Sequence, residues 1–163
     1  NERTMSMYFG HTKALAHELS SSTLEKKHYK NYYLMTALLV TVVYYYGMYS
    51  PYYDVRVIGF EGIVTLMIMG IGIHSAYKAN GGDDGEHFVS RITALSFPIL
   101  VQTTVAGVIF GLILLAAYYG LNVDQTKFDQ WYEWLISAFT IFLQILFFTR
   151  LISYMKRVKA HTI

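Results

Sequence analysis

Apolar residues along this chain gather into long runs that carry no charge. Four stretches contain no Asp, Glu, Lys or Arg, and they cover residues 31–50, 62–77, 92–123 and 134–149. About 20 apolar residues in a helix cross the roughly 30 Å hydrocarbon core of a membrane. Backbone polar groups in lipid must be satisfied within the segment, so such runs form helices. The pattern therefore predicts four membrane-spanning helices, at about residues 32–49, 57–77, 88–119 and 131–154.

A shorter periodic pattern precedes the first run. Apolar positions in the N-terminal arm recur every three or four residues and include Phe9, Leu15 and Leu19. This spacing predicts a short amphipathic helix, which either lies on the inner membrane surface or docks beneath the spans. We therefore expect an all-α integral membrane four-helix bundle. A cytoplasmic amphipathic arm covers residues 1–22, and the transmembrane domain covers residues 23–163.

The composition agrees with a membrane protein. Hydrophobic residues make up 54% of the chain and charged residues only 15%, whereas soluble domains average about 25% charged residues. The absence of cysteine excludes disulfides, thiolate metal sites and cysteine nucleophiles. A net charge of +2, scattered along the chain, does not favour nucleic-acid binding.

The distribution of Lys and Arg predicts an orientation. All but two of the thirteen basic residues lie in the N-terminal arm, the second connection or the C-terminal end. The exceptions, Arg56 and Lys127, fall in the first and third connections. Because cytoplasmic loops carry an excess of Lys and Arg, we expect both termini and the second connection to be cytoplasmic.

Small residues mark two candidate packing faces. Gly62 and Gly72 share one face of the second span, and Gly107 and Gly111 form a GxxxG motif in the third. Glycine faces let helices approach closely in lipid. These faces either pack the second span against the third or join separate copies of the chain. Four short spans enclose little volume, so a transport pathway would need several copies. Pro98 is expected to kink the third span.

Polar amides lie deep in the predicted spans. Gln102 should lie near the membrane midplane, and Gln144 a little below it. Polar groups at this depth are costly and are functional hypotheses by default. The two amides either form hydrogen bonds between helices or line a pore together with Thr103 and Thr104.

Few ionisable groups lie within the spans. Glu61 lies near the outer boundary, where it either pairs with Arg56 or forms a cation-attracting ring in an oligomer. All six histidines fall on the predicted cytoplasmic side, and only His74 and His87 flank the same loop. Metal binding and pH sensing are alternatives for this pair. A haem would need two histidines inside facing helices, and only His74 lies within a span.

The glycine-rich connection "ANGGDDGEHF" fits no established binding motif. Placing Gly85 at position 6 of a calcium-binding EF-hand loop puts Asn80, Gly82 and Asp84 at positions 1, 3 and 5, but Arg91 takes the place of the required Glu. A phosphate-binding P-loop would need a lysine after its glycines, which is missing.

Local structure explains this connection better. Asn80 or Gly81 can adopt the left-handed conformation that ends a helix. Asp83 and Glu86 have the spacing of a capping box for the third span. We therefore interpret the connection as a capped turn, with weak divalent-cation binding or partner docking as alternatives. The residues concerned are Asn80, Gly81, Gly82, Asp83, Asp84 and Glu86.

The stretch Asn80-Gly81-Gly82, followed by Gly85, Phe88 and Arg91, also resembles the second connection of small, uncharacterised bacterial membrane proteins with four spans. The resemblance covers about twelve residues and the span layout. It implies a bacterial inner-membrane location and carries no activity.

The sequence thus favours a membrane protein that is not an enzyme and holds no cofactor, because it shows no nucleophile–base set, acid pair or metal cluster. Our first functional hypothesis is a homo-oligomeric channel or pore-like protein. The second is a non-conducting accessory or regulatory subunit of a larger complex with a membrane or cytoplasmic partner. The third is a protein that binds a metal or haem through histidine.

Overall fold

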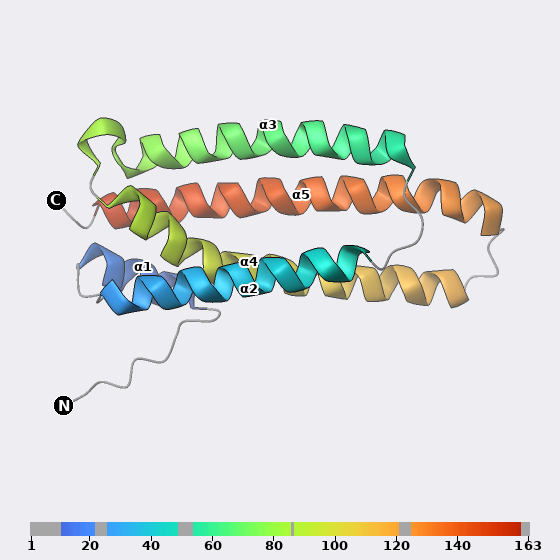
Figure 1. Cartoon of the computed structure of the whole chain (residues 1–163), viewed down its shortest axis with the longest axis horizontal. Coiled ribbons are helices and arrows are strands. Elements are labelled where there is room, and N and C mark those ends of the chain that lie inside the picture. The colour runs from blue at the N-terminus through green and yellow to red at the C-terminus, as the bar shows by residue number, and fades with distance from the viewer. Residues whose placement is uncertain (1–10, 22–25, 49–53, 86, 121–124, 161–163) are drawn as a thin grey trace, which may run out of the picture.

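The computed structural model describes residues 11–21, 26–48, 54–85, 87–120 and 125–160. In these ranges the chain is helical and has no strand, which confirms the all-α class. The elements are α1 (Thr12–Ser20), α2 (Lys26–Met48), α3 (Val55–Asn80), the 3₁₀ helix η1 (Gly82–Asp84), α4 (Phe88–Gly120) and α5 (Gln125–Ala160). The four long helices run side by side, and α1 lies at one end of them (Figure 1).

Three of the described helices are long and apolar enough to cross a membrane. They are α3, α4 over Phe88–Tyr118 and α5 over Trp131–Ala160. Three of the four predicted spans are therefore confirmed as helices that are long and apolar enough to cross a membrane. This result agrees with the expected class, an integral membrane protein. Helix α2 has 23 residues, which is sufficient length, but tyrosines flank its apolar centre at both ends.

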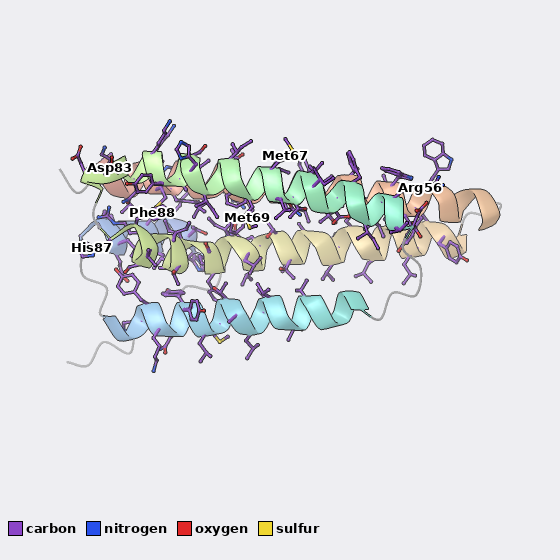
Figure 2. The ribbon with its side chains drawn as sticks, turned by 45° about the horizontal axis from the view of Figure 1, so that its top comes forward. Arg56, Met67, Met69, Asp83, His87 and Phe88 are labelled. Atoms are coloured by element: carbon purple, nitrogen blue, oxygen red, sulfur yellow. The ribbon has the colours of Figure 1, made fainter. Side chains whose placement is uncertain are left out.

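Helix α5 is the centre of the arrangement. Both α3 and α4 pack along it, and α2 packs against α4, whereas α3 and α4 share only a short contact. The long helices therefore follow the spatial order α3, α5, α4, α2 (Figures 1 and 2). Packing of the second span against the third, one of the two alternatives for the glycine faces, is limited to this short contact, and the main partner of α3 is α5.

A glycine on α3 explains this choice of partner. A Cβ atom added at Gly72 would lie 2.3 Å from ring carbons of Phe148 on α5, so the ring occupies the space that the glycine leaves. Gly107 faces α5 more loosely, since its added Cβ would lie 3.6 Å from Leu143. An added Cβ at Gly62 or Gly111 would meet nothing within 4 Å. Of the four predicted packing glycines, only Gly72 permits a close approach.

Helix α1 is docked onto the protein. Leu15 and Leu19 are almost completely buried, in one apolar cluster with residues of α4 and α5 such as Leu95 and Met155. The opposite face carries the exposed Lys13. The apolar face of α1 is therefore covered by α4 and α5, as the docking alternative expects. The more N-terminal part of the predicted arm lies outside the described residues.

Pro98 lies in the interior of α4 and is buried. Proline has no backbone N–H and clashes with the preceding turn, so it weakens a helix locally. The first turns of α4 run obliquely to the rest of the helix (Figure 1). This bend agrees with the expected kink of the third span.

The fit between Gly72 and Phe148 gives the first prediction. Replacing Gly72 by Ala places a methyl group in the space that the Phe148 ring occupies. Overpacking of this kind lowers the free energy of unfolding by about 1–3 kcal/mol. Thermal unfolding in detergent should therefore occur at a lower temperature. Gly70→Ala is the matched control, because an added Cβ there meets nothing within 4 Å. Equal stability of the two variants would contradict this account of the α3–α5 contact.

Candidate functional site

A groove with some polar side chains lies between α3 and α5. Its volume is about 330 Å³, and its lining combines apolar side chains with oxygen-bearing ones. The lining residues are Ile58, Glu61, Gly62, Thr65, Ile136 and Thr140. Glu61 is half-buried, whereas Gly62 is exposed. The glycine leaves the groove open to the outside beside the carboxyl group.

A hydrogen bond between α5 and α3 extends this polar row. Gln144 Nε2 donates to Thr65 Oγ1 over 3.0 Å. Glu61 and Thr65 are one helical turn apart on α3, as are Thr140 and Gln144 on α5, so each pair shares a helix face. The structure thus brings Glu61 and Gln144 to the same helix pair. Sequence reasoning missed Thr140, although its spacing of one turn from Gln144 was a usable signal.

Arg56 does not neutralise Glu61. No ion pair joins these two described residues, and the exposed Arg56 lies near the first turn of α3 (Figure 2). The backbone N–H of Arg56 donates to Asp54 Oδ1 over 2.8 Å, which caps the helix. Glu133 of α5 accepts from the backbone N–H of Asp54 over 2.8 Å. The carboxyl group of Glu61 in the groove is therefore not paired with Arg56. Carboxyl oxygens and threonine hydroxyls are suitable ligands for hard cations.

Gln102 has a different position from Gln144. Its amide nitrogen donates to Thr12 Oγ1 of α1 over 3.3 Å, and its amide oxygen accepts from Arg150 Nη1 of α5 over 2.6 Å. Gln102 therefore joins three helices inside the protein. Thr103 is buried, and its hydroxyl lies within hydrogen-bonding distance of carbonyls in its own helix. Neither these residues nor the half-buried Thr104 line the groove.

The glycine-rich connection is a tightly packed turn. Gly81 ends α3 in the left-handed conformation, with φ of 117°. Asn80 is 1% exposed, and its side-chain oxygen accepts from Arg91 Nη1 over 3.0 Å. A Cβ atom at Gly85 would lie 2.6 Å from the Asn80 carbonyl oxygen, so only glycine fits there. Burial raises the pKa of Tyr29 on α2, and the charge of Arg91 partly opposes this rise.

Asp83 does not lie at the start of α4, where the predicted capping box would place it. Asp83 accepts a hydrogen bond from the hydroxyl of Tyr77, and it lies in η1 rather than next to the start of α4 at Phe88. Gly82 has a positive φ of 62°, and Asp84 is exposed. Glu86 lies outside the described residues. The described residues of this connection form a turn in which Asp83 is bonded to Tyr77 of α3.

The two candidate histidine ligands are both exposed. His74 lies on α3, and His87 has a positive φ of 55° immediately before α4 (Figure 2). Within the described ranges, no three His, Cys, Asp or Glu side chains gather as a metal site would require. Neither histidine lines the α3–α5 groove.

No protein-family model, curated protein or solved structure matches this chain. The fold and the groove therefore have to be interpreted from the residues themselves. They define a helical integral membrane protein with a carboxyl group and hydroxyl groups in a groove between two of its apolar helices.

The position of Gln102 gives the second prediction. Gln102→Ala removes the side chain that joins Thr12 to Arg150, and each hydrogen bond contributes about 1 kcal/mol, or more when one partner is charged. Amide hydrogen exchange in α1 should accelerate roughly tenfold. Thr36→Val is the control, because its hydroxyl donates only to Tyr32 O within α2. Unchanged exchange in α1 would show that Gln102 does not hold it.

The Asn80–Arg91 bond gives the third prediction. Asn80→Ala leaves a buried guanidinium without one of its acceptors, and hydrogen bonds to charged groups contribute about 1.5–3 kcal/mol. The free energy of unfolding in detergent should fall by that order. Asp84→Ala, an exposed change in the same turn, should stay within about 0.5 kcal/mol of wild type. An equal loss in both variants would refute a specific role for Asn80.

Proposed function

We propose that α2 completes a four-helix domain in a bacterial inner membrane. Both termini of the protein lie on the cytoplasmic side of this membrane. At 1.5 Å per residue, its 23 residues extend about 34 Å, enough for the hydrocarbon core. Its side chains Leu34, Leu38 and Val42 are more than half exposed, as expected for side chains that face lipid. The described basic residues at the α1 end, such as Lys30, Lys78 and Lys159, support the orientation.

We further propose that the protein works as a homo-oligomeric channel for small cations, with the α3–α5 groove as its lining. The observation that carries this proposal is Glu61, half-buried beside Thr65 and Thr140 in an open groove on apolar helices. In a single chain this groove faces lipid, which is costly for polar groups. Copies that turn their grooves toward a shared centre would place these groups in water.

Packing supports a pathway between copies rather than within one. The interior contacts of α5 are filled by aromatic rings, such as Phe148 against Gly72 and Phe110 stacked on Phe139 at 3.7 Å between centroids. Beside the groove, added Cβ atoms at Gly59 and Gly62 would meet nothing within 4 Å. Such open glycines can receive a helix of a neighbouring copy. Glu61 would favour cations over anions.

A non-conducting accessory or regulatory subunit is the second candidate. The exposed surface of α4 favours it, because Gly111 has open space and lies among exposed apolar side chains, including Val108 and Leu112. A helix of a different membrane protein could pack there. In that case the purified protein would be monomeric and would pass no ions.

The fourth prediction tests the cation pathway. The wild-type protein should run as a discrete homo-oligomer by sizing with mass determination, and it should pass cations when reconstituted in liposomes. Glu61→Gln removes the charge at nearly constant volume, so cation-over-anion selectivity should fall severalfold. Asp84→Asn is the control, because it removes an exposed acid at the other end of α3. A monomer that passes no ions would refute the channel and favour the accessory subunit.

A further inference from the structure

A second pocket lies at the opposite end of the molecule, between α1 and α5. Its volume is about 160 Å³, and it is lined by Lys13, Ala16 and His17 of α1 and by Tyr154 and Arg157 of α5. Three of these five residues, Lys13, His17 and Arg157, have basic side chains. This pocket lies away from the α3–α5 groove, and the two sites have no lining residue in common.

The bases are held on a well-packed support. Leu15 and Leu19 fix α1 in the buried cluster, and Lys13 and His17 lie one helical turn apart on its other side. Across the pocket, the Arg157 guanidinium lies over the Tyr154 ring, 5.5 Å from its centroid. This cation–π contact fixes the side chain without consuming its hydrogen-bond donors. The pocket thus presents hydrogen-bond donors from two helices.

The charged side chains that line the pocket are all basic. No Asp or Glu is among its lining residues. Within the described part of the chain, no ion pair involves Lys13, His17 or Arg157. A small pocket with uncompensated ammonium and guanidinium groups attracts an anion.

We infer that this pocket binds a phosphate group. A guanidinium binds phosphate oxygens through two parallel hydrogen bonds, and an ammonium adds a compact charge. The phosphate of an anionic lipid headgroup lies at the end of the membrane-crossing helices, where basic pockets between helices receive it. A soluble phosphate compound offers the same chemistry from the aqueous side. This inference does not rest on the proposed channel.

The test measures binding of two probes to the full chain. In the lipid arm, native mass spectrometry compares retention of phosphatidylglycerol and phosphatidylcholine by protein in detergent. In the soluble arm, titration calorimetry measures inorganic phosphate binding. The variant is Lys13→Gln with Arg157→Gln. Each basic group near a membrane surface contributes about 1 kcal/mol, so the affinity of whichever probe binds should fall about tenfold or more.

The control variant is Lys78→Gln with Lys156→Gln, which removes equal charge at the same end outside the pocket. It should bind like wild type. Retention of phosphatidylglycerol alone identifies a lipid headgroup as the ligand, and binding of inorganic phosphate identifies a soluble one. Absence of binding by either probe, or equal losses in both variants, would overturn the inference. Because Lys13 and Arg157 are exposed, unfolding temperatures should confirm that all variants fold.

Discussion

Two apolar helices gain little from meeting in lipid, because lipid tails are as apolar as their side chains. Complementary shape must therefore supply the attraction, and α5 supplies it on both of its sides. Phe148 enters the space at Gly72 of α3, and Phe139 stacks on Phe110 of α4. The polar bonds, the turn and the docking of α1 all depend on helices held in this order. The groove that contains Glu61 exists because α3 and α5 meet along their length.

The positions of the helices could be predicted, but their partners could not. Charge-free runs indicated the three helices α3, α4 and α5, because a helix must have a minimum apolar length to cross the hydrocarbon core. The Gly107–Gly111 motif marked a candidate packing face, yet an added Cβ at Gly111 meets open space. A glycine indicates that something can approach closely and does not indicate which side chain will do so. The complement of Gly72 proved to be a phenylalanine of the last helix.

The same limit applies to the candidate sites. The turn after α3 could largely be predicted, because a left-handed Gly81 after Asn80 is a local requirement. Gln102 could not be assigned, since its bonding partner Thr12 lies 90 residues away in the sequence. Arg91, whose contacts the sequence did not predict, proved to be buried against Asn80. Thr140 lies one turn from Gln144 in the sequence, but its place in the groove follows only once α3 and α5 are known to be neighbours.

The central position of α5 also affects the order in which the molecule can assemble. Domains and their parts emerge from the ribosome beginning at the N-terminus. Helix α2 meets its partner α4 as soon as α4 is synthesised, but α3 has only a short contact with α4 and must wait for α5. During synthesis, α3 therefore spends that interval in the membrane without its main packing surface. The contact that unites the mature protein is among the last to form.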